Sequence, residues 1–285
     1  MLEVGIGLPN PVPGTPGRAL VDWARRAEER GFAGLATIDR IAYPSYESLI
    51  ALAAAAAATE RIGLLTNVLL GPTRNPVLLA KEAASVDQIS GGRLVLGLGV
   101  GGRDDDFLAT GQDFHSRGKS FDDDLELMHR AWKGELVAGA RKPVTPKPTR
   151  GDRVPILIGG SSDRAIERTV KWGIGWTVGG APPEQGAPFA ERIRSAWKEA
   201  GREGQPRIVG LTYFGLGDGA LEAATSYLGD YYGDMGKQIA QWIPKTPEDL
   251  KSTVKKFADF GFDQLYLDPV SSDLRQVDLA ADAVL

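Results

Sequence analysis

The chain has 285 residues, of which 42% are hydrophobic and 25% are charged, and its formal net charge is −4. This composition is typical of a globular protein with a sizeable core, and no run of Lys and Arg indicates a nucleic-acid partner. The chain has no cysteine, which excludes disulfides, thiol nucleophiles and Cys-zinc sites. Two histidines, His115 and His129, are too few for a His-rich metal centre. We predict no metal site, although a carboxylate-only cation site stays open.

No apolar run reaches the ~20 residues that a membrane helix needs. The longest run, residues 49–58, is short and consists largely of alanine. The first residues lack the basic segment of a signal peptide and include Glu3. We therefore expect a cytoplasmic protein with no membrane partner.

Short apolar runs alternate with amphipathic runs, which predicts alternating strands and helices. The predicted strands are EVGIGLP, GLATI, RIGLLTNVLL, RLVLGLG, PILIGG, GWTVGG, RIVGLTYFGL and QLYLDPV. The predicted helices are GRALVDWARRAEERGF, residues 45–59, NPVLLAKEAASVDQIS, FDDDLELMHRAWKG, DRAIERTVKWG, PFAERIRSAWKEAG, EDLKSTVKKFADFGF and a terminal helix through Leu285. Gly31 is expected to end the first helix, and Asn75 with Pro76 to begin the third.

About eight β–α units of this kind are typical of a (β/α)8 barrel, and apolar strands are expected where both faces of a parallel sheet are buried. A doubly wound sheet is the rival fold. The even spread of strands and the lack of a linker favour the barrel. We predict an α/β fold, a (β/α)8 TIM barrel formed by a single domain of residues 1–285. Residues 104–120, 135–153 and 231–247 are expected to be loop insertions.

The stretch RLVLGLGVGGRDDDF contains Gly97, Gly99 and Gly102 in the dinucleotide-binding spacing G-x-G-x-x-G. Its context does not fit, because the acidic residues 104–106 should form a polar loop or a helix start and not the stem of a Rossmann helix. The alternative is that Gly99, Gly101 and Gly102 allow a flat ligand to approach the end of the strand closely.

A second glycine-rich turn, PILIGGSSDRAIERTV, places Gly159, Gly160, Ser161 and Ser162 between a strand and a helix. Free N–H groups and the helix dipole attract a phosphate at such a position. The next strand ends in a similar way, with Gly179 and Gly180. The pair of turns favours phosphate binding over the alternative that these glycines only make tight turns.

Three stretches resemble the bacterial-luciferase-like flavin-dependent oxidoreductases: RIGLLTNVLLGPTRNPVLLAKEAASVDQISGGRLVLGLGVGG, FHSRGKSFDDDLELMHRAW and PILIGGSSDRAIERTVKWGIGW. They cover most of residues 61–176 in family order. The resemblance implies a luciferase-like barrel that binds reduced FMN or the deazaflavin coenzyme F420 at the carboxyl ends of its strands. The GPTRNP turn is more similar to the deazaflavin-using branch, which favours F420.

The resemblance also implies roles for particular residues. The cofactor ring would lie against the end of the third strand, where a non-proline cis peptide is expected at Asn67–Val68. The phosphate cradle maps onto residues 159–162, with Gly179 and Gly180 beside it. A separate flavin reductase or F420 reductase is an expected partner. The alanines of residues 53–58 are expected to form a homodimer contact.

The chain departs from the family at two positions that transfer protons. Many members have Asp-His after the second strand, where this chain has Asp39-Arg40, and the sugar-phosphate dehydrogenases have a glutamate where it has Gly102. Arg40 cannot act as a base, so we expect it to hold an anionic substrate or to stabilise developing negative charge. Asp39 is expected to be catalytic because it follows a barrel strand.

Tyr43 and Tyr46 follow on a loop that should overhang the mouth of the barrel, so either a substrate-binding role or simple packing is open. His129 is expected to border the core, and His115 to serve local packing. The predicted function is hydride transfer to or from a small organic molecule, or its oxygenation. The rivals are a cofactor-free lyase or isomerase acting on a phosphorylated substrate, and a non-catalytic flavin carrier.

Overall fold

The computed structural model describes residues 2–285 and contains one closed parallel sheet. Its strands are β1 (Glu3–Gly7), β2 (Gly34–Thr37), β3 (Gly63–Thr66), β4 (Leu69–Leu70), β5 (Leu94–Gly99), β6 (Ile156–Gly159), β7 (Gly175–Thr177), β8 (Arg207–Phe214) and β9 (Gln264–Pro269). The order is β3-β2-β1-β9-β8-β7-β6-β5-β4, and a direct pairing of β3 with β5 closes the ring. The two-residue strand β4 continues β3 along β5, so the prediction of a (β/α)8 barrel is confirmed.

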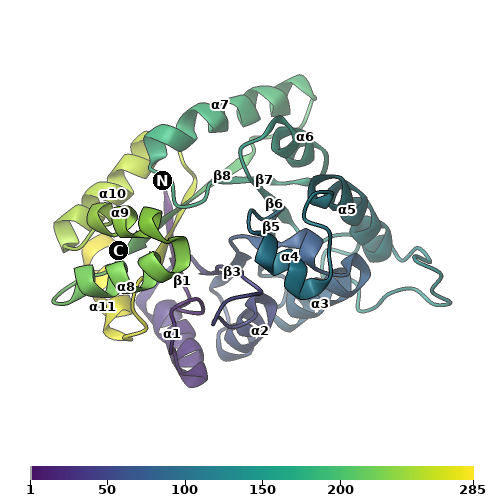
Figure 1. Cartoon of the computed structure of the whole chain (residues 1–285). Coiled ribbons are helices and arrows are strands. Elements are labelled where there is room, and N and C mark those ends of the chain that lie inside the picture. The colour runs from purple at the N-terminus through teal and green to yellow at the C-terminus, as the bar shows by residue number, and fades with distance from the viewer. Residues whose placement is uncertain (1) are drawn as a thin grey trace.

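Helices surround the ring of strands (Figure 1). They are α1 (Gly17–Arg30), α2 (Ser48–Ala58), α3 (Pro76–Ile89), α4 (Asp104–Thr110), α5 (Arg117–Lys133), α6 (Asp163–Trp172), α7 (Pro183–Glu199), α8 (Ala220–Tyr232), α9 (Asp234–Trp242), α10 (Pro247–Asp259) and α11 (Arg275–Val284), with a 3-10 turn η1 (Gly71–Thr73). The predicted helix ends are confirmed. Gly31 ends α1 with a φ of 90°, and the Asn75 side chain accepts hydrogen bonds from two backbone N–H groups at the start of α3.

The interior of the barrel is filled by side chains from five strands: Ala36, Leu65, Leu157, Val209 and Tyr266. Side chains from strands on opposite sides of the ring can meet only inside it. A Cβ at Gly5 would overlap the Tyr266 ring, and one at Gly7 would overlap the Asp268 carboxyl group. The missing side chains on β1 therefore make room for the inward-facing side chains of β9.

The acidic stretch after β5 forms a helix start, which is one of the two alternatives expected there. Helix α4 begins at Asp104, and acidic residues in its first turn are favoured by the helix dipole. Asp106 and Phe107 are both 1% exposed, because one is paired with an arginine and the other packs into the protein. These tertiary contacts stabilise the short helix α4.

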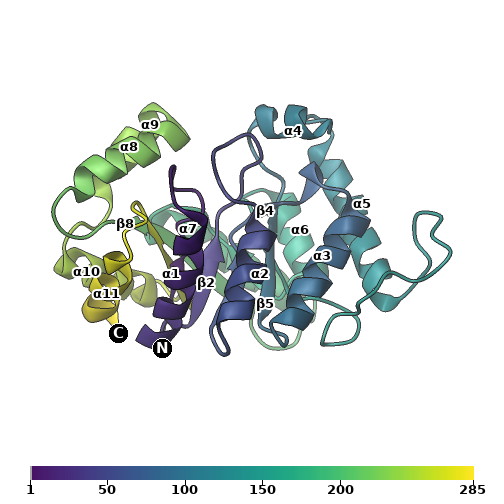
Figure 2. The ribbon, with the colours of Figure 1, turned by 90° about the horizontal axis from the view of Figure 1, so that it is seen from below.

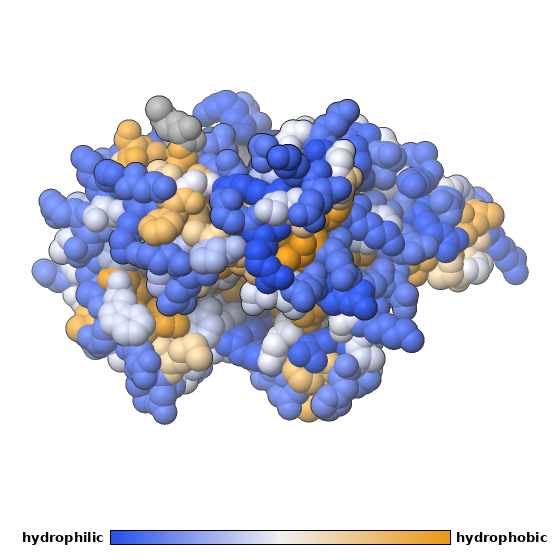
Figure 3. Space-filling model, turned by 90° about the horizontal axis from the view of Figure 1, so that it is seen from above, coloured by the Kyte–Doolittle hydropathy of each residue, from blue (hydrophilic) through white to orange (hydrophobic). Residues whose placement is uncertain are grey.

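The segment after β8 differs from the prediction, since residues 231–247 were expected to be an irregular insertion. The structure contains α8 and α9, which pack against each other. The buried positions of α8 include Ala224, Tyr227, Leu228 and Tyr231, a helical spacing. Figure 2 shows α8, α9 and α4 on the same side of the barrel, and Figure 3 shows the surface hollowed between two lobes.

The segment before β6 and the start of α7 also relate to predictions from the sequence. Residues 134–155 contain no helix or strand, as expected for an insertion, and project from the body of the protein in Figure 1. Helix α7 was expected to begin at Pro188. It begins five residues earlier, at Pro183, and contains Pro188 in its interior. Among residues 2–285, no helix is both long and apolar enough to cross a membrane.

Substitution of Gly97 by alanine should destabilise the barrel, because a Cβ there would overlap the Thr66 carbonyl oxygen. We expect Gly97→Ala to lower the free energy of unfolding by about 1–3 kcal/mol, the usual cost of overpacking. Gly102→Ala is the control, since no atom lies within 4 Å of its Cβ position. It should change stability by no more than about 1 kcal/mol. Equal urea midpoints for the two variants would contradict this account of barrel closure.

Candidate functional site

The carboxyl ends of the strands form the mouth of the barrel, where side chains from neighbouring strands meet. Asn67 follows β3, and a cis peptide joins it to Val68, as the family resemblance predicted. The Asn67 Oδ1 atom accepts a hydrogen bond of 2.7 Å from the Thr177 hydroxyl at the end of β7. The Asn67 Nδ2 atom is buried and has no partner among residues 2–285. Asn67 therefore offers an unused N–H donor at the mouth.

The Val68 side chain lies over the ends of β5 and β6. A Cβ at Gly99 would be 2.8 Å from Val68 Cγ2, and one at Gly159 would be 3.1 Å from Val68 Cγ1. Gly101 has a φ of +75° and lies against Leu70. Glycine at positions 99 and 159 thus admits Val68 between the strand ends. A direct approach of a ligand to Gly99 or Gly101 stays a prediction.

The glycine-rich turn after β6 leads into α6 as expected. The Ser162 side chain accepts a hydrogen bond from the Ala165 N–H at 3.3 Å and caps the helix. Gly160 adopts a φ of +102°, which favours glycine, and its carbonyl accepts a hydrogen bond from the Trp176 indole. Ser161 is exposed, and so are Gly179 and Gly180 after the next strand. No atom lies within 4 Å of the Cβ position of Gly179, whereas Gly180 packs against Tyr213.

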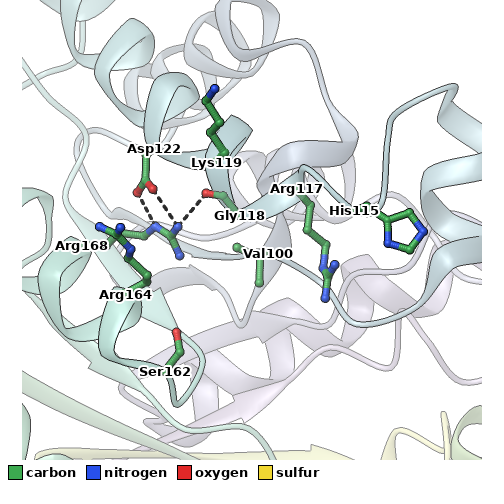
Figure 4. A pocket seen from close by; sticks show the side chains of 9 residues that line it. All are labelled: Val100, His115, Arg117, Gly118, Lys119, Asp122, Ser162, Arg164 and Arg168. Atoms are coloured by element: carbon green, nitrogen blue, oxygen red, sulfur yellow. Dashed lines mark hydrogen bonds and ion pairs between the residues drawn. The ribbon is translucent and has the colours of Figure 1, made fainter.

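A cavity of about 600 Å³ lies beside the start of α6, and we call it the cationic cavity. Its lining comes from the end of β5, from α5 with the preceding loop, and from α6 (Figure 4). The lining residues are Val100, His115, Arg117, Gly118, Lys119, Asp122, Ser162, Arg164 and Arg168. Four arginine or lysine side chains face one carboxylate, so the cavity suits an anionic group. Of the predicted cradle residues, only Ser162 lines it.

Two of these cations are held in place by the protein. Arg168 is 6% exposed and donates hydrogen bonds to the Asp122 carboxylate at 2.6 and 3.0 Å and to the Gly118 carbonyl at 2.7 Å. Arg117 donates to the Gly101 carbonyl at 3.1 Å and lies over the Phe114 ring. Lys119 and Arg164 are exposed at the cavity's edge. Sequence reasoning missed all four cations. Two signals were present: Arg117 and Lys119 lie close together in HSRGKS, and Arg164 and Arg168 follow the serine turn.

Asp39, the predicted catalytic acid, is 3% exposed and surrounded by donors. Arg74 donates to its two carboxylate oxygens at 2.7 and 2.9 Å, and the Leu70 N–H donates at 2.9 Å. The Ser48 hydroxyl adds a fourth hydrogen bond of 3.2 Å. These contacts join the end of β2 to the turn after β4 and to α2. The carboxylate is thus fully engaged in holding three segments of the mouth together.

Arg40 is likewise paired with acidic side chains. Its guanidinium donates to Asp106 at 2.7 Å and to Asp105 at 2.9 Å. The second Asp106 oxygen accepts hydrogen bonds of 2.8 Å from the Ile41 and Ala42 N–H groups. The pair therefore fastens the loop after β2 to α4. A role of Arg40 towards an anionic substrate would require these ion pairs to open.

The loop after Arg40 contributes the two predicted aromatic residues. The Tyr43 hydroxyl donates a hydrogen bond of 2.6 Å to Asp230 on α8, and its ring contacts that of Tyr231 edge-on at 5.0 Å between centroids. The Tyr46 hydroxyl donates to the Thr15 carbonyl at 2.7 Å, and the side chain is 39% exposed. Tyr43 thus joins a group of buried tyrosines on β8 and α8, whereas Tyr46 anchors the loop after β1.

Asp268 near the end of β9 was not expected to belong to the site. It is 3% exposed, and neither carboxylate oxygen has a hydrogen-bond partner among the described residues. Burial raises the pKa of its carboxyl group well above the ordinary value. The sequence offered one signal, an acidic residue within the otherwise apolar strand QLYLDPV.

A family model described as luciferase-like monooxygenase matches residues 3–279. The chain belongs to the luciferase-like monooxygenase family. Among curated proteins, this family member is similar to an uncharacterised protein of Mycobacterium tuberculosis, with 29% identity over 208 residues, which is 63% of this chain and 71% of that protein. A second uncharacterised protein of the same organism is 31% identical over 173 residues, covering 57% of this chain and 60% of that protein.

Solved structures with the luciferase-like fold include F420-dependent enzymes and a monooxygenase in complex with FMN. An F420-dependent secondary alcohol dehydrogenase superposes with a TM-score of 0.82 and 18% identity, covering 99% of this chain and 98% of that one. The monooxygenase RslO1 from Streptomyces bottropensis has a TM-score of 0.81 and 23% identity over the same shares of both chains. An F420-dependent tetrahydromethanopterin reductase from Methanopyrus kandleri has a TM-score of 0.79 and 18% identity, again with 99% and 98% covered.

The stability of an Asp39 variant of this luciferase-like chain tests whether Asp39 has a structural role. Asp39→Asn removes the charge that pairs with buried Arg74, so we expect the free energy of unfolding to fall by about 3–5 kcal/mol. Glu47→Gln, which removes the second, half-exposed carboxylate on Arg74, should cost about 1 kcal/mol or less. The measurement is urea denaturation of both variants. An Asp39→Asn variant with unchanged stability would contradict the structural role and favour the catalytic one.

Proposed function

We propose that the chain is an oxidoreductase that binds F420, in preference to FMN, at the mouth of the barrel and transfers hydride to or from a small organic substrate. The observation that supports the cofactor is the cationic cavity beside Ser162 at the start of α6, because the N-terminus of a helix favours an anionic group. F420-dependent and FMN-binding enzymes both occur among the solved structures of the same fold, which supports a cofactor of this class.

The chemistry of the cavity favours F420. F420 carries a phosphodiester followed by glutamate carboxylates, whereas FMN ends in a single phosphate. Arg117 and Arg168 are fixed by hydrogen bonds that leave each guanidinium one terminal nitrogen, Nη2 of Arg117 and Nη1 of Arg168, to donate to a phosphate oxygen. Lys119 and Arg164 lie further out and are exposed, so they suit additional carboxylates. Asp122 pairs with Arg168 and Glu167 pairs with Arg164, so the excess positive charge of the cavity comes from Arg117 and Lys119.

The mouth fits the ring of such a cofactor through Asn67. Its buried Nδ2 atom lacks an acceptor in the described part of the chain, and a ring carbonyl would supply one. The hydrogen bond from Thr177 to Asn67 Oδ1 fixes the orientation of the amide, so that the N–H groups are the ones presented. When bound, a flavin or deazaflavin supplies the hydride chemistry, and the chain supplies position and exclusion of water.

The contacts above the mouth hold the segments that would surround a substrate. Arg40 ties the loop after β2 to α4 through Asp106, and Tyr43 ties the same loop to α8 through Asp230. The Arg103 guanidinium donates to the Tyr231 carbonyl at 2.8 Å, joining the start of α4 to α8. We propose that Tyr43 lines the substrate pocket within this frame. A role for Tyr46 stays a prediction.

A homodimer through α2 also stays a prediction. On this helix, Ile50 is 72% exposed, and Ala54 and Ala57 are exposed as well. Small side chains allow close approach of another helix, which is consistent with a contact between two copies.

The proposed function is tested by titrating the protein with oxidised and reduced F420 and FMN and following the quenching of ligand fluorescence. Micromolar binding of F420 alone would support the proposal. A preference for FMN would favour a monooxygenase served by a separate flavin reductase. Binding without substrate-dependent turnover would favour a flavin carrier. If neither cofactor binds, a cofactor-free enzyme acting on a phosphorylated substrate becomes the better account.

Removal of the outer cations should discriminate between the two cofactors. We expect Lys119→Ala and Arg164→Ala each to weaken F420 binding about fivefold, or about 1 kcal/mol, with a smaller effect on FMN. Lys171→Ala is the matched control, because Lys171 also lies on α6 but stacks on Trp172 outside the cavity. It should change the F420 dissociation constant by less than about twofold. Equal effects of all three substitutions would argue against tail binding in the cavity.

A further inference from the structure

Asp268 is a buried carboxyl group that the contacts described above leave without a partner. Its side chain points into the barrel, because it lies two residues after Tyr266, a member of the interior cluster, and side chains alternate along a strand. The carboxyl group lies against Gly7, where any side chain would overlap it. An unpaired buried polar group is costly, so its retention at the end of a barrel strand points to a ligand.

The groups that face Asp268 are phenols. Tyr266 on β9, Tyr213 on β8, and Tyr227 and Tyr232 on α8 all lie close enough for the Asp268 charge to raise the pKa of their hydroxyls further, after the larger effect of burial. The Tyr213 and Tyr232 hydroxyls bond to each other at 2.7 Å. Burial raises the pKa of the Asp268 carboxyl group, and no cationic side chain among residues 2–285 offsets this effect. These surroundings favour the protonated carboxyl group.

The order of strands places Asp268 across the mouth from the cationic cavity. In the ring β3-β2-β1-β9-β8-β7-β6-β5, β9 lies opposite β5, and the cavity lies at the end of β5 and the start of α6. Asn67 lies on the cavity's side, after β3, which pairs with β5. A cofactor with its tail in the cavity and its ring near Asn67 would therefore leave the side of Asp268 to the substrate.

The mouth also needs a group that can exchange a proton. Arg40 cannot, and its charge is paired with Asp105 and Asp106. Asp39 is bound by Arg74, and Gly102 has no side chain. Asp268 is the one carboxyl group of these strand ends, among the described residues, that no cation or hydrogen-bond donor engages.

We propose that Asp268 is the catalytic residue that exchanges a proton with the substrate. The proposal rests on the proposed oxidoreductase function. In the reduction of a C=O or C=N bond, the substrate carbon takes a hydride from the reduced cofactor and the heteroatom takes the Asp268 proton, so the C–H and heteroatom–H bonds form as the π bond breaks. The aspartate left behind regains a proton from water. Oxidation of an alcohol or amine runs through the same steps in reverse.

The test is infrared difference spectroscopy of the whole protein, with acetone as the smallest carbonyl probe. Wild type minus Asp268→Asn should show the C=O band of a protonated carboxyl group at neutral pH. Acetone added at high concentration should shift this band in the wild type, because its oxygen accepts the carboxyl proton. Asp87→Asn is the control. Asp87 is also buried with an unpaired oxygen, but it lies on α3 outside the barrel. In that variant the band and its shift should persist.

Two results would overturn the proposal. The first is the absence of the band, which would mean an ionised carboxylate. The second is a band that acetone leaves unmoved, which would mean that Asp268 is a buried structural acid beyond the reach of a substrate. If Asp268→Asn does not fold, isotope-labelled aspartate in the Asp87→Asn variant shows whether a protonated aspartate other than Asp87 gives the band and whether acetone shifts it.

A separate measurement distinguishes failure of this proposal from failure of the proposed function. The dissociation constants of F420 and FMN for Asp268→Asn should stay within about threefold of the wild type, because the carboxyl group lies away from the cavity. With a substrate in hand, kcat should fall by about 10²–10⁴-fold, the range of general acid–base catalysis. If the wild type binds neither cofactor, the proposed oxidoreductase function is wrong. The infrared result then still decides whether the Asp268 carboxyl group is protonated.

Discussion

The close approach of β3 and β5 is the constraint on which the rest of the structure depends. Gly97 lies against the Thr66 carbonyl so closely that no side chain could be accommodated, and the Thr66 hydroxyl donates a hydrogen bond of 2.7 Å to the Gly97 carbonyl. This contact closes the parallel ring and brings the carboxyl ends of the strands to one mouth. It also sets the Asn67–Val68 peptide beside β5 and β6, where Val68 fills the space over two glycines. Gly97 and Gly99 of the fingerprint-like stretch therefore serve the packing of the barrel strands and not a Rossmann turn.

The polar groups at the mouth are of two kinds, those paired within the protein and those without a partner among the described residues. Asp39 and Arg40 are each buried in ion pairs, and breaking a buried pair is strongly unfavourable because it leaves an uncompensated charge. These pairs hold segments of the chain in position, and a catalytic role for Asp39 or Arg40 stays a prediction. Asn67 Nδ2 and the Asp268 carboxyl group have no partner among residues 2–285, so a ligand that reached them would break no existing hydrogen bond. The groups that we propose for binding thus differ from those that the residue types alone suggested.

The sequence was sufficient for the fold because its information is local. Strands, helix caps and the serine turn are encoded in short runs such as NPVLLAKEAASVDQIS and PILIGGSSDR, and their even alternation predicts a barrel. The site depends on contacts between distant segments. Asp39 meets Arg74, and Arg40 meets Asp106, 66 residues away. No periodicity reveals such pairs, so the sequence suggested a catalytic role for Asp39 without showing that it is paired with Arg74. The same holds for the cationic cavity, whose arginines come from two helices, and for Asp268, whose isolation is a property of the packed barrel.

The central claim is that the cationic cavity and Asn67 hold one cofactor between them, with its anionic tail beside Ser162. The most direct measurement is a crystal structure of the protein soaked with F420. The account predicts the phosphodiester between Arg117 and Arg168, and a ring carbonyl within hydrogen-bond distance of Asn67 Nδ2. Density for the phosphodiester elsewhere on the barrel, or a ring on the far side of the mouth from Asn67, would contradict it.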